Sequence, residues 1–117
     1  MKRKRIKSRI YLAGPMRGLP ELNHPAFNRE AARLRRLGWD VVNPVEVGEK
    51  FGSAEKLAED DALLERLMRH ELALLAECDA VLLLEGWELS AGARRELQVA
   101  LDCGLDLFVS RTGWRRA

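Results

Sequence analysis

A continuous apolar run, Ala80-Val-Leu-Leu-Leu84, constrains the fold of this chain more than any other feature. Five apolar residues in a row are typical of a strand that is buried on both faces, as in a parallel sheet covered by helices on either side. A second short run, Arg9–Ala13, stops at the breaker pair Gly14-Pro15 and also predicts a strand. We expect two further strands at 39–43 and 105–109.

Amphipathic segments separate these runs. Apolar residues recur at helical spacing over 25–37, and again over about 59–77. Ser90 is a good N-cap for a third helix, which we expect to end at Gly104, whereas residues 45–54 are expected to form a loop. Alternating strands and helices with short links predict an α/β fold, a Rossmann-like three-layer sandwich around a mainly parallel sheet of four to five strands.

The length of 117 residues fits a single domain. We place this domain at residues 10–110, between a flexible basic N-terminal arm over 1–9 and a basic C-terminal tail over 111–117. The domain itself is acidic, because residues 10–110 hold 11 basic and 18 acidic side chains, a net charge of −7. No aromatic residues are interleaved with the arm to stack on bases, so a nucleic-acid partner is disfavoured.

The sequence also restricts compartment and metal chemistry. No apolar run approaches the ~18 residues that span a bilayer, and no signal-peptide segment follows the basic N-terminus, so we expect a cytoplasmic protein without a membrane partner. Cys78 and Cys103 lie in apolar contexts, which favours buried, reduced thiols. With His24 and His70 as the two histidines and no Cys-x-x-Cys pair, no metal site is expected.

In parallel α/β sheets, ligands bind beyond the carboxyl ends of the strands, where the strand order reverses. If the first strand is central, this crevice is lined by the loop after Ala13, the loop after Leu84 and the start of the third helix. The loop Gly14–Gly18 has the outline of a phosphate-facing loop, in which Arg17 is either a solvated charge or an anion clamp. It is neither a Gly-x-Gly-x-x-Gly nor a Walker A sequence, so no dinucleotide or ATP cofactor is expected.

Glu96 is the most informative residue of the third helix. At 100° per residue it lies on the apolar arc, opposite Arg94 and Arg95. A carboxylate on a core-facing stripe needs a partner or takes an upward shift of its pKa. Two interpretations of Glu96 are open. It is an edge residue whose carboxylate reaches water or pairs with a nearby arginine, or it projects into the crevice and acts as nucleophile or general base. The apolar arc consists of Leu89, Ala93, Leu97, Ala100, Leu101 and Cys103.

Four other residues allow a structural and a functional interpretation. Ser90 and Gly92 open the third helix with a hydroxyl and a bare backbone, which either receive a phosphate or form a plain cap. Trp87 either stacks on a base or covers the sheet edge. Glu71 lies on the more polar side of the second helix, where composition alone predicts a solvated charge. Acyl transfer is disfavoured because there is no Gly-x-Ser-x-Gly elbow.

Three segments in order resemble the nucleoside 2-deoxyribosyltransferase superfamily: Ile10–Gly18, Glu71–Val81, and Ser90-x-Gly92-x-x-x-Glu96-x-x-x-Ala100. Within it the chain is most similar to the small, often phage-associated DUF4406 proteins, and its ligand motifs are similar to those of the deoxynucleoside 5′-monophosphate N-glycosidases. The resemblance covers roughly residues 9–109. It implies a nucleoside or nucleotide as small-molecule partner and a homodimer or higher homo-oligomer.

The resemblance also implies catalytic roles. Glu96 attacks the anomeric carbon of a 2-deoxyribosyl group and displaces the base, and water or a second base then completes hydrolysis or transfer. Tyr11 corresponds to a residue near the sugar and the nucleophile, and Glu71 to a supporting carboxylate that is usually Asp. We predict substrate contacts at Gly14, Arg17, Gly18, Asn43, Trp87, Ser90 and Gly92.

We accordingly expect an enzyme that cleaves the N-glycosidic bond of a deoxynucleoside 5′-monophosphate or nucleoside through a covalent glycosyl-enzyme. Glu71 in place of Asp supports a second hypothesis, because a carboxyl group displaced by ~1 Å can lose about 10²-fold in rate. On that hypothesis the chain is a nucleotide-binding or regulatory protein with weak or no catalysis. A nucleic-acid accessory role for the basic arm is the third.

Overall fold

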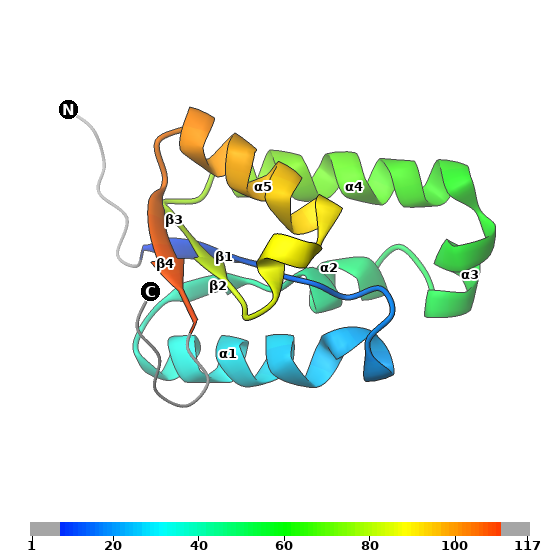
Figure 1. Cartoon of the computed structure of the whole chain (residues 1–117), viewed down its shortest axis with the longest axis horizontal. Coiled ribbons are helices and arrows are strands. Elements are labelled where there is room, and N and C mark those ends of the chain that lie inside the picture. The colour runs from blue at the N-terminus through cyan, green and yellow to red at the C-terminus, as the bar shows by residue number, and fades with distance from the viewer. Residues whose placement is uncertain (1–7, 111–117) are drawn as a thin grey trace.

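The computed structural model describes residues 8–110, and Figure 1 shows a sheet between two helical layers. The strands are β1 (Arg9–Ala13), β2 (Asp40–Val42), β3 (Ala80–Leu83) and β4 (Asp106–Val109). They pair in the order β2-β1-β3-β4, and all three pairings are parallel. For the described residues, this confirms the predicted Rossmann-like α/β fold with four strands.

Strand β1 lies inside the sheet, with Ile10 aligned to Val41 of β2 on one side and to Ala80 of β3 on the other. The chain leaves β1 in one direction to form β2 and crosses back to form β3. The strand order therefore reverses between β1 and β3, and the predicted crevice belongs beyond the ends of these two strands.

Three long helices cover the sheet. Helix α1 (His24–Arg36) lies on one face, and helices α4 (Asp61–Ala76) and α5 (Ala91–Asp102) lie side by side on the other (Figure 1). The two faces have separate apolar clusters, because successive side chains of a strand point to opposite sides of the sheet.

Strand β1 shows this alternation directly. Ile10 and Leu12 pack toward α1, whereas Tyr11 and Ala13 pack toward α4 and α5. All four residues are buried. The alternation therefore places the one tyrosine of the chain, with its polar hydroxyl, in the layer that contains α4 and α5.

The prediction of a loop over 45–54 is wrong. Helix α2 (Pro44–Glu49) and the start of helix α3 (Ala54–Glu59) occupy that segment. Each has a capping side chain: Asn43 Oδ1 accepts from Val45 N at 3.1 Å, and Ser53 Oγ accepts from Lys56 N at 3.1 Å. Such caps satisfy the free N–H groups at a helix start, which lets these short helices form without a long apolar stripe.

The third predicted helix is α5, but part of its apolar arc is not buried. Ala93 and Ala100 are buried, whereas Leu89 and Leu101 are 89% and 53% exposed. Leu89 precedes α5 in the short helix η2 (Trp87–Leu89), so the helical periodicity does not extend to it. The prediction of a buried Cys103 is also wrong, because it follows the last turn of α5 and is exposed, while Cys78 is buried.

Most of the basic N-terminal arm and the whole C-terminal tail lie outside the described residues. Arg9, the last residue of the predicted arm, opens β1, and its Nε is 2.9 Å from Asp40 Oδ2. Among residues 8–110, no helix has the length and apolar character needed to cross a membrane.

Candidate functional site

The hydroxyl group of Tyr11 donates a hydrogen bond to Oε2 of Glu96 at 2.7 Å. Tyr11 comes from the middle of the sheet and is fully buried, and Glu96 comes from the second turn of α5 and is half-buried. A carboxylate in this position needs a hydrogen-bond donor, because losing its water is costly. The partner of Glu96 is thus a buried tyrosine rather than an arginine at the edge of the stripe.

Glu71 is a second carboxyl group in the same layer. It comes from α4, which packs against α5, and it is half-buried. Burial, followed by the negative charge of Glu96, raises the pKa of Glu71 to about 8. The expectation from composition alone, a solvated charge, is therefore wrong. The packing of α5 against α4 partly buries Glu71, which the sequence pattern of α4 alone would place in solvent.

The pKa of Glu96 is also raised, to about 7. Burial is the main cause, and the hydrogen bond from Tyr11 and the charge of Arg95 oppose it. Burial and the charges of Glu96 and Glu71 raise the pKa of Tyr11 well above its ordinary value. Between about pH 7 and 8, the cluster therefore contains a neutral tyrosine, a largely ionised Glu96 and a largely protonated Glu71.

The start of α5 combines a cap with open space. Ser90 Oγ accepts a hydrogen bond from Ala93 N at 3.1 Å, which confirms Ser90 as the N-cap. A Cβ atom added at Gly92 would meet nothing closer than Ser90 Oγ at 3.9 Å. No neighbouring atom of the described residues therefore demands a glycine there, and the backbone of this turn is accessible to a ligand. Phosphate binding by Ser90 and Gly92 remains a prediction.

The loops after β1 and β3 contact each other at the switch point. A Cβ atom at Gly14 would lie 2.8 Å from Cβ of Leu84, and one at Gly86 would lie 3.3 Å from Cγ of Pro15. The close approach of the two loops thus explains why residue 14 is a glycine. Its predicted contact with substrate stays a prediction.

Arg17 and Gly18 lie farther along the loop after β1, and both are exposed. Gly18 has a φ of +80°, a conformation that glycine adopts without strain. Arg17 forms no hydrogen bond or ion pair with any described residue, so its guanidinium group is accessible to an anion. Neither residue forms a hydrogen bond or ion pair with Tyr11 or Glu96.

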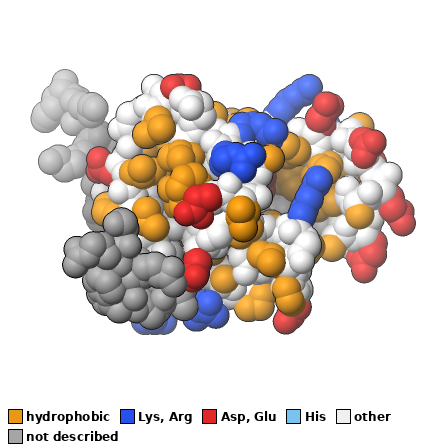
Figure 2. Space-filling view, in the orientation of Figure 1, with side chains coloured by type: hydrophobic (Ala, Val, Ile, Leu, Met, Phe, Trp, Pro, Cys, Tyr) orange, Lys and Arg blue, Asp and Glu red, His pale blue; other side chains and the backbone are white. Residues whose placement is uncertain are grey.

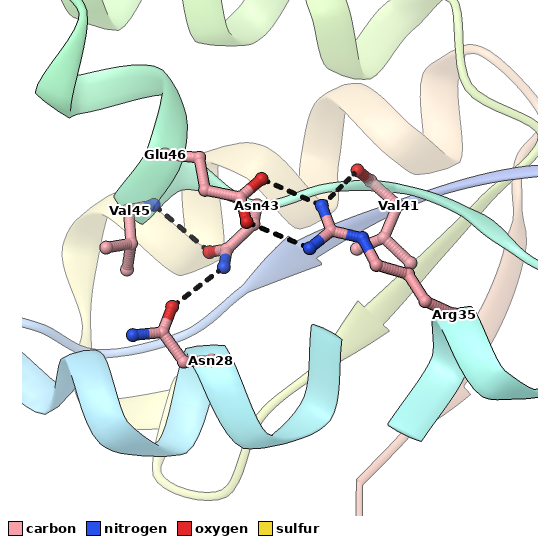
Figure 3. A network of polar contacts seen from close by, with 6 residues as sticks. All are labelled: Asn28, Arg35, Val41, Asn43, Val45 and Glu46. Carbon is pink, nitrogen blue, oxygen red and sulfur yellow. Dashed lines mark hydrogen bonds and ion pairs between the residues drawn. The ribbon is translucent and has the colours of Figure 1, made fainter. Parts of the chain in front are cut away.

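Asn43 lies at the end of β2 and is buried in a separate polar network (Figure 3). Its Oδ1 caps α2 through Val45 N, and its Nδ2 donates to Asn28 Oδ1 at 3.0 Å. Arg35 joins the same region by donating to Glu46 Oε1 at 2.7 Å. The side chain of Asn43 therefore has a structural role, and its predicted contact with the base is untested. The Asn-Pro pair before a short helix was the signal for this cap.

Trp87 lies in η2 and is half-buried against the cluster that contains Tyr11. It covers the core at the end of β3, as the structural interpretation of this residue expects. Stacking on a base remains a prediction.

A cleft of about 290 Å³ lies on the other side of the sheet. Sequence reasoning did not find it, because its walls come from the first turns of α1 and from the residues that follow β3 and β4. Its rim is held by Asn23, which has a φ of 60° and whose Nδ2 donates to Pro15 O at 2.9 Å. The cleft is lined by Leu19, Asn23, Ala26, Arg29, Glu30, Leu84, Glu85 and Ser110.

The described residues contain no group of three or more histidine, cysteine, aspartate or glutamate side chains placed to hold a metal ion. The candidate chemistry is that of two carboxyl groups and a tyrosine.

In comparisons with known proteins, a family model described as a domain of unknown function, DUF4406, matches residues 8–109. No match is found among curated proteins.

Proposed function

Because the chain belongs to the DUF4406 family, which is defined without a function, we propose a function from the site itself. The protein cleaves the N-glycosidic bond of a deoxynucleoside 5′-monophosphate, with Glu96 as the nucleophile. The observation that carries this proposal is the 2.7 Å hydrogen bond from buried Tyr11 to Glu96, together with the second, half-buried carboxyl group of Glu71. Kinship with the nucleoside 2-deoxyribosyltransferase superfamily is part of the proposal and rests on the order of the sequence motifs.

In the first step, a carboxylate oxygen of Glu96 bonds to C1′ of the deoxyribose while the bond from C1′ to the base nitrogen breaks. The electron pair of that bond goes to the base, which takes the proton of Glu71. Two carboxyl groups with different pKa values suit this division, because one must be ionised and the other protonated at the same pH. The pKa values of about 7 and 8 favour Glu96 as the nucleophile and Glu71 as the acid.

In the second step, a water oxygen attacks C1′ of the glycosyl ester. Its proton goes to the Glu71 carboxylate, and the electron pair of the ester bond returns to Glu96. The products are the free base and 2-deoxyribose 5-phosphate, and a second base in place of water gives 2-deoxyribosyl transfer. Both steps invert C1′, so the overall reaction retains configuration.

Tyr11 positions the nucleophile during this cycle. Its hydroxyl can donate to only one acceptor, and that acceptor is Oε2 of Glu96. The other oxygen, Oε1, is then the one that attacks. The raised pKa of Tyr11 keeps the donor proton in place throughout the pH range in which Glu96 ionises.

The start of α5 supports the choice of a phosphorylated substrate. The positive end of the helix dipole and the free N–H groups of its first turn attract an anion. The open backbone at Gly92 lets a phosphate approach, and the same helix carries Glu96 one turn later. Exposed Arg17 offers a further positive charge on a flexible side chain.

Base release from a panel of deoxynucleoside and ribonucleoside 5′-monophosphates and free nucleosides tests the proposal. We expect the native protein to release base from at least one deoxynucleoside 5′-monophosphate, and Glu96→Gln to reduce release to background. Glu65→Gln is the matched control, because Glu65 is an exposed residue on α4 and should leave the rate unchanged. The comparison is made by chromatography of the free base.

A specific alternative follows if neither native protein nor Glu96→Gln releases base. Glu71 in place of the usual Asp favours a protein that binds nucleotide without turnover. In that case deoxynucleoside 5′-monophosphates should still raise the melting temperature of both proteins by binding the folded state. No base release and no thermal shift from any nucleotide would contradict both functions.

Gly92→Ala tests the phosphate contact by itself. Alanine is favoured over glycine in a helix by up to about 1 kcal/mol, and the added Cβ has space, so thermal stability should stay equal or rise. The same Cβ lies where the phosphate is proposed to approach, so KM for the 5′-monophosphate should rise. Cleavage of the free nucleoside should not change. Equal effects on both substrates would show that the phosphate does not bind at Gly92.

A further inference from the structure

Strand β4 forms one edge of the sheet, and no described strand pairs with its outer side. Its four residues, Asp106–Val109, are all exposed, and three of them are apolar. Natural edge strands are usually protected by lysine, proline, bulges or a covering element, because free backbone groups and apolar side chains invite another strand. Residues 106–110 contain neither lysine nor proline.

The two edges of the sheet differ in this respect. Strand β2 has three residues, and its first residue, Asp40, is paired with Arg9. Strand β4 is apolar on both faces. Phe108 aligns with Leu82 on the α1 side, where its ring packs edge-on against Trp39 at 6.0 Å between centroids.

Leu107 and Val109 project to the opposite side, because they align with residues of β3 that pack toward α5. They are 45% and 43% exposed, and Leu101 on α5 is 53% exposed. Figure 2 shows hydrophobic side chains gathered over α5 and β4. An apolar surface thus continues from the helix to the edge of the sheet.

The backbone of β4 defines which groups are free. Asp106 N donates to Asp79 O at 3.0 Å and Ser110 N donates to Leu83 O at 2.8 Å, so the N–H groups of these residues point into the sheet. Since strand residues alternate, the N–H and C=O groups of Leu107 and Val109 point outward. The outer edge therefore offers two donors and two acceptors.

We propose that this edge is where two copies of the chain join, with β4 of each copy antiparallel to β4 of the other and the two sheets continuous. The two-fold axis passes beside Phe108. In this register Leu107 of one copy opposes Val109 of the other, and each such pair exchanges two hydrogen bonds. All four outward groups of each strand are then satisfied by the same groups of the second copy.

The neighbouring register is less complete. An axis beside Leu107 would bring Val109 opposite Leu105, but Leu105 N already donates to Ala100 O at 2.9 Å. Charge favours the same choice. With the axis beside Phe108, Asp106 of one copy opposes Ser110 of the other, so the two aspartates lie at opposite ends of the pairing. A second copy therefore complements this edge in hydrogen bonds, apolar side chains and charge.

The proposal does not depend on the glycosidase chemistry, and the mass of the full chain in solution tests its first part. Sedimentation velocity across a range of concentrations should show a dimer. Val109→Pro removes one outward N–H without changing a bond to β3, and should give a monomer with an unchanged circular dichroism spectrum. Val109→Thr keeps the N–H and the β-branched shape, and should remain dimeric. A native monomer at all concentrations overturns the proposal.

Disulfide cross-linking tests the register. In the proposed pairing the two Phe108 Cα atoms form a non-hydrogen-bonded pair about 4.5 Å apart, within disulfide range. The two Asp106 residues are then about 13 Å apart along the strands. In a Cys103→Ser background, which removes the exposed thiol, Phe108→Cys should form a covalent dimer on oxidation and Asp106→Cys should not. Equal cross-linking by both variants, or none by Phe108→Cys, contradicts the register.

Discussion

At the scale of single residues, the candidate site consists of three titratable groups: Tyr11, which is buried, and Glu96 and Glu71, which are half-buried. Tyr11 donates a hydrogen bond to Glu96. Glu71 is a second carboxyl group, and the negative charge of Glu96 disfavours its ionisation. Natural proteins rarely bury two carboxyl groups together without a use for the raised pKa values. The helix pattern of α5 pointed to Glu96, whereas only the packing of α4 against α5 identified Glu71 by its environment.

The pH dependence of base release follows from the two carboxyl groups. The rate should rise as Glu96 ionises near pH 7 and fall as Glu71 loses its proton near pH 8, so kcat/KM should be bell-shaped. Glu71→Gln should lower the rate about 10²- to 10⁴-fold, as loss of a general acid does, and should remove the alkaline limb. A retained alkaline limb in Glu71→Gln would assign that limb to another group.

Tyr11→Phe should move the acid limb of the pH profile upward and lower the maximum of kcat/KM. The hydrogen bond from Tyr11 lowers the pKa of Glu96, so its removal should move that pKa upward. A hydrogen bond to a charged group contributes about 1.5 to 3 kcal/mol, which corresponds to about one to two pH units. The measurement is the pH profile of kcat/KM for both proteins. An acid limb that stays in place would show that Tyr11 does not act on the ionised form of Glu96.

At the scale of elements, caps and loop contacts determine how the strand ends are arranged. Asn43 turns the chain from β2 into α2, and the contact of Gly14 with Leu84 sets the distance between the loops after β1 and β3. These arrangements were only partly predictable. Ser90 was identified as a cap from its place before an amphipathic helix, but α2 and α3 have too few residues to show a periodic stripe.

Asn43→Ala should destabilise the protein by about 1 to 3 kcal/mol. The change removes the cap of α2 and leaves the buried Val45 N–H without its acceptor. The midpoint of chemical denaturation should fall. Glu49→Ala is the control, because Glu49 is an exposed residue of the same helix, and its loss should cost less than about 0.5 kcal/mol. A larger loss from Glu49→Ala than from Asn43→Ala would contradict the role assigned to the cap.

At the scale of the whole molecule, the half-buried carboxyl groups of Glu71 and Glu96 reduce stability when they ionise. Glu71 and Glu96 have raised pKa values, so the folded protein retains protons that the unfolded chain releases above its ordinary carboxyl pKa of 4.5. Well below that pH, both groups are protonated in the folded and in the unfolded protein, and the stability is at its full value. Stability should therefore fall as the pH rises from about 5 through 8, because ionisation in the buried space is unfavourable.

Glu71→Gln should make this dependence weaker. The neutral amide has nearly the same shape and cannot ionise, so the melting temperature of the variant should exceed that of the native protein at pH 9 and approach it at pH 4.5. Thermal unfolding across this pH range is the measurement, with Glu65→Gln as the exposed control. If the difference in melting temperature between the native protein and Glu71→Gln were the same at pH 9 and at pH 5, Glu71 would not be buried in this way.

The sequence by itself determined the strands, the main helices and the position of Glu96 on an apolar helix stripe. Unbroken apolar runs and helical spacing are local patterns that can be read from the sequence. A carboxylate among apolar residues of one helix stripe can be recognised in the same way. Only the tertiary structure decided the partner of Glu96, the raised pKa of Glu71, the capping role of Asn43 and the exposure of β4. Each depends on which surfaces of separate elements meet, and that is fixed by packing between residues far apart in the chain.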